Sequence, residues 1–301
     1  MRISQLFEKK KAVYSFEIFP PKASDDIGKI YSTLESIKDI APDYVSVTYS
    51  AGGSRNSRTA EIADLLKNRY GMEPLAHLTC VNSTMGEVEE AIDKLNKIGV
   101  ENILALRGDR IEGQERGEFN YCTDLIPVIK RLSNADIGAA CYPEGHPESR
   151  NMVEDIRNLK KKVDLGVTHL NTQLFFDNDV FLNFMDKVRL AGIDVPVQAG
   201  IMPLVKKSQF GGIVRMTGAG IPTKIARMYA RFADDPQSLE DAGVAYATDQ
   251  IIDLLSAGVQ GIHLYIMNNA RVARRITENI KPILDRINGC LLYTSDAADE
   301  L

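Results

Sequence analysis

Strand-like and helix-like segments alternate along almost the whole chain. Short runs rich in β-branched and aromatic residues are separated by stretches with apolar residues at helical spacing. The runs begin near Val13, Tyr44, Pro74, Glu101, Asp136, His169, Val195 and Gly261. Eight successive strand–helix units predict an α/β fold of the (β/α)8 type, a TIM barrel, in which all strands are parallel.

Capping and spacing signals place individual helices. Ser24 precedes an apolar series that predicts a helix over residues 27–37, and Thr84 with Glu87 forms a capping-box pattern before another helix. The seventh and eighth strand-like runs are about twice as far apart as the others, so we expect extra helices within residues 222–257. A doubly wound open sheet is the alternative, but it would have fewer strands and usually a glycine-rich phosphate turn. No GxGxxG turn leading into a helix is present.

The chain shows no linker of low complexity, so we assign residues 1–289 to a single catalytic domain. Residues 290–301, CLLYTSDAADEL, follow a complete amphipathic helix and do not continue its period. This segment resembles the translation of an adapter used in sequencing libraries. We therefore predict that it is a non-native tail with no part in the fold.

Composition excludes several classes of function. The formal net charge is -5 without a long basic block, which gives no reason to expect a nucleic-acid partner. No apolar run approaches the roughly 20 residues of a membrane helix, and no apolar stretch follows the first basic residues, so we expect a cytoplasmic protein. Four cysteines without CxxC spacing predict neither a disulfide framework nor a metal site. A small-molecule ligand and a homo-oligomer are expected.

Polar residues alternate with apolar residues along the expected strands. In the first strand, Ser15 and Glu17 alternate with Tyr14, Phe16 and Ile18. If the apolar set faces the outer helices, the polar set converges at the carboxyl end of the barrel lumen, where barrel enzymes have their active sites. The polar positions in the other strands are Ser46, Thr48, His77, Thr79, Arg107, Asp109, Tyr142, Asn171, Gln173, Gln198, His263 and Tyr265.

Glu17 is the strongest candidate for proton transfer. It lies between Phe16 and Ile18 in the segment FEIFPPK, so its carboxyl group should be partly desolvated. Because desolvation favours the protonated form of a carboxyl group, we predict that Glu17 is a general acid. The structural alternative is an inward-facing glutamate paired with lysine or arginine.

Three further segments carry groups that could bind a cofactor. Arg107 and Asp109 in LRGD could hold a polar heterocycle or a phosphate, although an internal salt bridge between them is the alternative. Tyr142 and His146 could stack on a cofactor or form hydrogen bonds with it, although His146 could equally be an ordinary loop histidine. In the following helix the spacing places three polar residues on one face, although a charged run like this is usually a solvated face. These residues are Asp155, Asn158 and Lys162.

Nine short sequence segments occur in the order found in methylenetetrahydrofolate reductases, and the chain resembles that family from Tyr14 to Ile287. The segments are FEIFPPK, YVSVTYSAGG, PLAHLTC, LALRGD, YPEGHPE, NLKKKVDLG, NTQLFFDN, GIMPL and IHLYIMN. The resemblance implies a flavin-containing (β/α)8 barrel, in agreement with the number of strands expected from the alternation.

The resemblance also implies roles for individual residues. It makes Glu17 the catalytic general acid and Asp109 the catalytic acidic residue beside the flavin ring. Gln173 and Gln209 match residues that touch folate or nicotinamide, and Asn269 stands where an arginine that holds substrate is expected. The residues implied to contact FAD are Thr48, Tyr49, Ala51, His77, Arg107, Gly108, Asp109, Cys122, Tyr142, His146, Ser149, Asp155, Asn158, Lys161 and Lys162.

The implied reaction is the reduction of 5,10-methylenetetrahydrofolate to 5-methyltetrahydrofolate in one-carbon metabolism and methionine biosynthesis. Hydride would pass from NADH or NADPH through FAD, and Glu17 would protonate the folate nitrogen as the bridging ring opens. One alternative is an accessory flavin- or folate-binding barrel subunit that receives electrons from a partner protein. Another is a folate-binding barrel of the methyltransferase type. Glu17, Asp109 and Gln173 favour the reductase.

Overall fold

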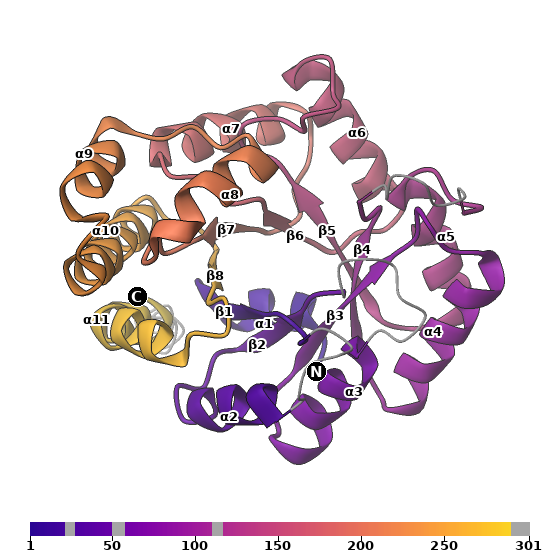
Figure 1. Ribbon diagram of the computed structural model, residues 1–301. Coiled ribbons are helices and arrows are strands. Elements are labelled where there is room, and N and C mark those ends of the chain that lie inside the picture. The colour runs from indigo at the N-terminus through magenta and orange to yellow at the C-terminus, as the bar shows by residue number, and fades with distance from the viewer. Residues whose placement is uncertain (22–27, 50–57, 110–116, 290–301) are drawn as a thin grey trace, which may run out of the picture.

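Eight parallel strands close into a barrel in the order of the chain, as the computed structural model shows (Figure 1). The structure describes residues 1–21, 28–49, 58–109 and 117–289, without the side chains of residues 29 and 213–216. The predicted (β/α)8 barrel is confirmed. The strands are β1 (Val13–Ile18), β2 (Tyr44–Val47), β3 (Pro74–Thr79), β4 (Asn102–Leu106), β5 (Asp136–Cys141), β6 (His169–Thr172), β7 (Val197–Ile201) and β8 (Gly261–Tyr265).

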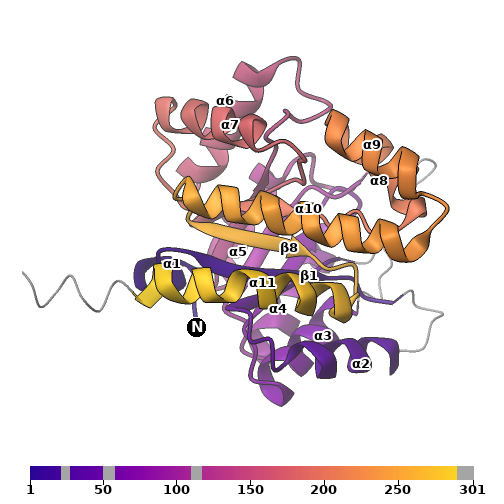
Figure 2. The same ribbon diagram turned by 90° about the vertical axis from the view of Figure 1, so that its left-hand side faces the viewer.

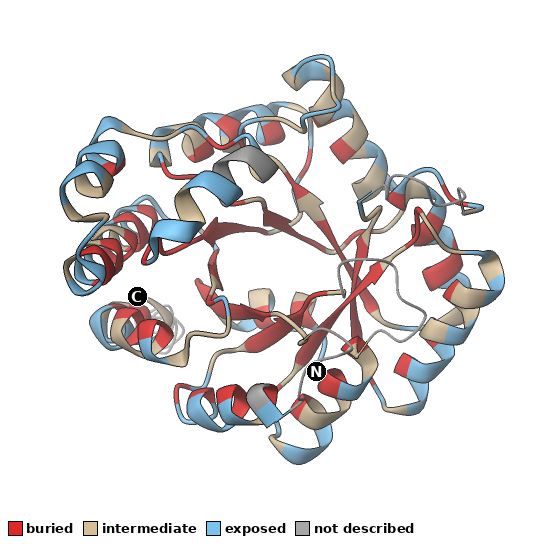
Figure 3. Cartoon of the chain, in the orientation of Figure 1, coloured by how far each residue is buried: buried red, intermediate tan, exposed pale blue. Residues whose placement is uncertain are grey.

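Helices surround the strands, and their buried sides face the barrel (Figure 3). The Thr84 capping box is present, since the Glu87 amide donates to the Thr84 hydroxyl at 3.3 Å and the Thr84 amide donates to the Glu87 carboxylate at 2.9 Å. The helices outside the segment between β7 and β8 are α1 (Ile3–Lys9), α2 (Gly28–Ile37), α3 (Thr59–Asp64) continued by a π-helix (Leu65–Arg69), α4 (Met85–Lys97), α5 (Cys122–Leu132), α6 (Met152–Asp164), α7 (Asn178–Leu190) and α11 (Ala270–Gly289). The predicted Ser24 cap and the tail 290–301 lie outside the described residues.

The long segment between β7 and β8 contains three helices. They are α8 (Lys207–Thr217), α9 (Thr223–Phe232) and α10 (Pro236–Ser256), so the extra helices expected there are confirmed. Asp235 caps α10 by accepting a hydrogen bond from the Ser238 amide. Among the described helices, none is both long enough and apolar enough to cross a membrane.

Helix α1 closes the amino-terminal end of the barrel, a feature that the strand–helix alternation does not predict. Ile3 and Leu6 are buried against Tyr44 and Leu104, and the Ile3 amide donates to the Asn102 side chain at 2.8 Å. Figure 2 shows α1 at one end of the barrel and α8 with α9 toward the other. A functional site is therefore expected at the carboxyl ends of the strands.

Candidate active site

Glu17 lies in the lumen of the barrel between two imidazoles. Its Cα is in register with those of Ser46 in β2 and Tyr265 in β8, and the residue is only 7% exposed. The carboxylate Oε2 lies 3.2 Å from His263 Nε2 and 3.5 Å from His77 Nε2. The lysine or arginine partner of the structural alternative is not found among the described residues, so imidazoles surround this carboxyl group.

A chain of hydrogen bonds orients His263 behind Glu17. His263 Nδ1 lies 2.7 Å from the Ser15 hydroxyl, and the Gln198 amide donates to that same hydroxyl oxygen at 3.1 Å. Because Ser15 accepts from Gln198, its own proton can be donated to His263 Nδ1, which leaves the Nε2 proton to face Glu17. On the other side, the Ser46 hydroxyl lies 2.6 Å from His77 Nε2. The polar strand positions thus converge in the lumen as the alternation predicts.

Two histidines in the lumen are neutral at pH 7. Burial lowers the pKa of His77 to about 4, against the opposing attraction of Glu17. Burial also lowers the pKa of His169, at the start of β6, to about 4. The Nε2 atom of His169 has no hydrogen-bond partner among the described residues. Neither imidazole can therefore carry a positive charge without destabilising the folded barrel.

We expect the free energy of unfolding to decrease as the pH falls from about 6.5 toward about 4. His77 and His169 bind protons more weakly when folded than when unfolded, so the stability is complete above the unfolded pKa and is lost on acidification. The expected loss is about 2 kcal/mol for each histidine at pH 5, measured by urea unfolding. His169→Leu should remove about half of this pH dependence, and an unchanged dependence would contradict the assignment.

The residues predicted to contact a cofactor lie along the carboxyl ends of β2 to β5. Thr48 is buried, Tyr49 is half-buried on the core, and Ala51 lies outside the described residues. Gly108 has a φ of +83°, and a Cβ there would lie 2.9 Å from Thr79 Cβ. Glycine is therefore required at position 108 both by the left-handed backbone and by the close contact with Thr79.

Arg107 and Asp109 do not pair with each other. The Arg107 guanidinium forms an ion pair with Glu148 at 2.5 Å, and this bond raises the pKa of Arg107. The Asp109 side chain is exposed, and its backbone carbonyl accepts from the Asn82 side chain at 3.0 Å. The internal Arg107–Asp109 salt bridge, the alternative considered from the sequence, is therefore wrong, and Asp109 is an exposed residue after the end of β4.

The loop after β5 and the start of α6 form the next part of this edge. The Tyr142 and His146 rings meet edge to face, with centroids 4.7 Å apart. The Ser149 hydroxyl donates to the Asp155 carboxylate at 3.0 Å. The Lys162 ammonium donates to the Ala140 carbonyl at 2.9 Å, so this face of α6 contacts the barrel and is not merely solvated. The other predicted residues here are Cys122, buried at the start of α5, and Asn158, which accepts from Lys161 at 3.2 Å.

The residues predicted to bind substrate follow the carboxyl ends of β6, β7 and β8. The backbone amide of Gln173 donates to the Cys141 carbonyl at 2.7 Å, which fixes the chain at the end of β6. Gln209 accepts hydrogen bonds from the Val205 and Lys206 amides through its side-chain oxygen. Gln209 and Asn269 line one cavity of about 220 Å³, which Gln173 does not line.

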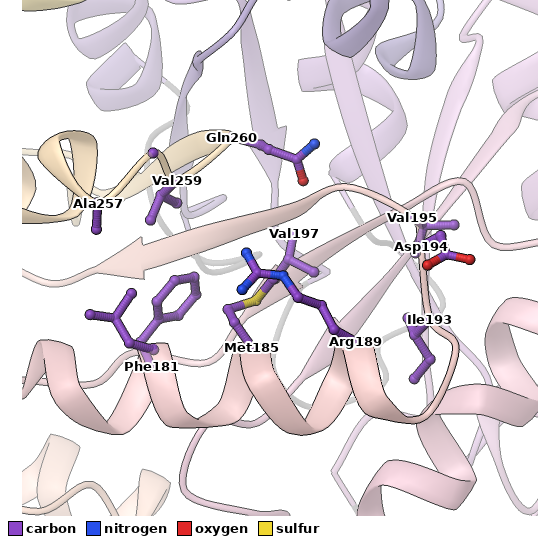
Figure 4. A pocket seen from close by; sticks show the side chains of 12 residues that line it. Phe181, Met185, Arg189, Ile193, Asp194, Val195, Val197, Ala257, Val259 and Gln260 are labelled. Atoms are coloured by element: carbon purple, nitrogen blue, oxygen red, sulfur yellow. The ribbon is translucent and has the colours of Figure 1, made fainter.

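A second cavity of about 380 Å³ lies at the amino-terminal ends of β7 and β8, beside α7 (Figure 4). Its wall is mostly apolar and includes Phe181, Met185 and Val197, with Arg189 and Asp194 as charged residues. It contains none of the residues predicted to bind cofactor or substrate. The described part of the chain also holds no group of three or more His, Cys, Asp or Glu side chains arranged for a metal ion.

The sequence did not reveal the partners of the predicted residues. His263 is one of the polar strand positions, but its contact with Glu17 depends on closure of the barrel between β1 and β8. Glu148 belongs to the YPEGHPE segment, and its pairing with Arg107 also joins two separate loops. Strand alternation identifies the residues that face the lumen, whereas the neighbouring strand determines which of them meet.

Comparison with known proteins assigns this barrel to a family. A family model described as methylenetetrahydrofolate reductase matches residues 2–281. The 5,10-methylenetetrahydrofolate reductase of Escherichia coli (strain K12) is 35% identical over 266 residues, covering 88% of this chain and 90% of that protein. Methylenetetrahydrofolate reductase (NADH) 1 of Arabidopsis thaliana is 32% identical over 298 residues, covering 93% of this chain and 50% of that protein.

A solved structure with the same fold is an uncharacterised protein from Clostridium thermocellum that binds two copies of 5-methyl-5,6,7,8-tetrahydrofolic acid. It aligns with a TM-score of 0.66 at 13% identity and covers 94% of this chain and 100% of its own. At this identity the likeness supports the fold alone, whereas the family model and the relatives match nearly the whole chain. The chain therefore belongs to the methylenetetrahydrofolate reductase family.

Proposed function

We propose that this protein reduces 5,10-methylenetetrahydrofolate to 5-methyltetrahydrofolate with NADH or NADPH as the donor and FAD as the hydride carrier. The observation that carries the proposal is Glu17, a carboxyl group buried in the lumen with an imidazole nitrogen 3.2 Å from one oxygen. The names of the relatives support the reaction, and the name of the Arabidopsis thaliana relative supports NADH.

The carboxyl ends of β2 to β5 fit a flavin nucleotide. Arg107 and Lys162 place cations at this edge, and Tyr142 and His146 place aromatic rings there. FAD, when bound, supplies the hydride-transfer chemistry. The residues that would hold it are Thr48, Tyr49, Ala51, His77, Arg107, Gly108, Asp109, Cys122, Tyr142, His146, Ser149, Asp155, Asn158, Lys161 and Lys162.

The chain itself provides the proton. Glu17 delivers a proton from its carboxyl group to the folate nitrogen that leaves the methylene bridge, and the resulting iminium carbon accepts hydride. The His263 Nε2 proton then hydrogen-bonds the carboxylate left behind, and Ser15 and Gln198 hold His263 in that orientation. The neutral His77 stands on the other side of the same oxygen. Asp109 lies at the barrel rim, where its carboxylate would face the flavin edge.

We expect His263→Leu to slow the reaction with methylenetetrahydrofolate about 10-fold, because Glu17 loses a buried hydrogen bond worth about 1.4 kcal/mol. Reduction of the flavin by NADH should change by less than about 3-fold, since that step needs no proton from Glu17. The two half-reactions are measured separately by stopped-flow absorbance. His169→Leu is the matched control, because His169 is equally buried but makes no contact with Glu17. Equal loss in both variants would contradict the role of His263.

The proposed reaction is tested by steady-state turnover of the purified protein with methylenetetrahydrofolate and either NADH or NADPH. We expect 5-methyltetrahydrofolate to form in a 1:1 ratio to the nicotinamide that is oxidised. Oxidation of nicotinamide without formation of methyltetrahydrofolate would favour the accessory flavin-binding subunit. Folate binding without any flavin in the purified protein would favour the methyltransferase-type barrel.

A further inference from the structure

The cavity beside Gln209 and Asn269 has the character of an anion site next to an apolar wall. Its volume is about 220 Å³, and Val205, Ile266 and Val272 form part of its apolar side. Lys206 is the one charged residue among the described residues that line it, and no aspartate or glutamate belongs to that lining. The amino-terminal ends of α8 and α11 border the cavity, and their partial positive charge adds to that of Lys206.

The other cations near this cavity are already paired. Lys207 forms an ion pair with Asp234 at 2.6 Å, and Arg271 forms one with Glu240 at 2.5 Å. No ion pair of Lys206 is found within residues 1–21, 28–49, 58–109 and 117–289, and its side chain is exposed to solvent. Lys206 is therefore the cation at this edge that can pair with a ligand.

Asn269 caps the amino-terminal end of α11. Its side-chain oxygen accepts a hydrogen bond from the Val272 amide at 3.2 Å, as an N-cap residue does. An arginine at this position has no acceptor and could not make that bond. Residue 269 therefore brings no cation to this cavity, whereas Lys206, which also lines it, does.

The cavity lies one strand away from the proposed acid. Tyr265 lines the cavity, and its Cα is in register with that of Glu17 in the neighbouring strand. In a folate, the nitrogen that Glu17 would protonate is attached to a p-aminobenzoyl group, and the far end of that group carries a glutamate with two carboxylates. We infer that Lys206 binds a carboxylate of this glutamate and thereby determines the preference for glutamate-bearing folates. This inference rests on the proposed function.

The inference is tested with Lys206→Met, the charge-conserving Lys206→Arg, and Lys207→Met as the matched control. We expect Lys206→Met to raise the KM for methylenetetrahydrofolate about 10-fold with kcat within about 2-fold, because a charge-assisted contact is lost. Its Kd for 5-methyltetrahydrofolate, measured by isothermal titration calorimetry, should rise by the same factor. Lys206→Arg should stay within about 3-fold of wild type, and Lys207→Met and the flavin content should be unchanged.

A folate that lacks the glutamate tests the proposed contact between Lys206 and the glutamate carboxylate separately from other effects of the substitution. For methylenetetrahydropteroate, which ends at the p-aminobenzoate, Lys206→Met and wild type should have KM values within about 2-fold of each other. An equal loss with both substrates would overturn the inference, as would an unchanged KM in Lys206→Met. If wild-type protein reduces methylenetetrahydrofolate, either result leaves the proposed function standing. If wild type does not reduce it, the proposed function and the inference both fail.

Discussion

Glu17→Gln is expected to slow the reaction with methylenetetrahydrofolate by roughly 100-fold or more, the usual contribution of a general acid. The glutamine keeps the size of the side chain and can still accept a hydrogen bond from His263 Nε2, which lies 3.2 Å from the present carboxylate. It has no acidic proton to give to the folate nitrogen. The expected loss therefore falls on the half-reaction with folate, measured as reoxidation of the reduced flavin in an anaerobic stopped-flow experiment.

Reduction of the flavin by the nicotinamide is the internal control for the Glu17→Gln variant. Reduction of the flavin by NADH or NADPH needs no proton from Glu17 and should stay within about 10-fold of wild type, an allowance of about 1.4 kcal/mol for the altered electrostatics. If both half-reactions slowed equally, Glu17 would have a structural role. If neither slowed, its assignment as the general acid would be wrong.

Gly200→Ala is expected to destabilise the barrel by about 3 kcal/mol, because it places a methyl group where there is no space. The Tyr265 hydroxyl donates to the Thr172 carbonyl at 2.7 Å across the Gly200 position in β7. A Cβ on Gly200 would lie 2.4 Å from that carbonyl oxygen and 2.8 Å from Tyr265 Cε2. Because the Thr172 carbonyl blocks one side of the new methyl group, either β7 or Tyr265 must shift. Urea unfolding measures the resulting loss in the free energy of unfolding.

Gly212→Ala is the matched control for this substitution. Gly212 lies in α8, and nothing lies within 4 Å of a Cβ built there. An alanine at this helical position should raise the free energy of unfolding by about 0.5 to 1 kcal/mol. Equal effects of the two substitutions would contradict the close approach of Tyr265 to β7.

The fold could be predicted from the sequence because its signals are local. Strand alternation, capping residues and the wide spacing between β7 and β8 each depend on neighbouring residues, and the barrel with its extra helices is confirmed. Helix α1 was missed because seven residues are too few to show a helical period. Its burial depends on the amino-terminal end of the lumen, which exists only after the barrel has closed.

The contacts between the candidate site residues could not be predicted from the sequence, because they are made across the barrel. The strand pattern predicted that Glu17 faces the lumen, but its partner His263 lies 246 residues away in the sequence. The sequence left a salt bridge between Arg107 and Asp109 open as an alternative, whereas the loop after β5 brings Glu148 to Arg107. The helix-capping role of Asn269 follows from where α11 begins, which the resemblance did not reveal. Residue types and parity are set locally, while the pairing of polar groups depends on the closed barrel.

The proposed reaction requires one barrel site to transfer hydride from a reduced nicotinamide to a folate through a bound flavin. The flavin absorbance of the purified protein tests this under anaerobic conditions, recorded during stepwise addition of NADH or NADPH and then of methylenetetrahydrofolate. We expect a yellow protein that is bleached by the nicotinamide and recovers its colour as stoichiometric 5-methyltetrahydrofolate forms. A colourless protein, or a flavin that the nicotinamide bleaches but methylenetetrahydrofolate does not reoxidise, would contradict the proposed function.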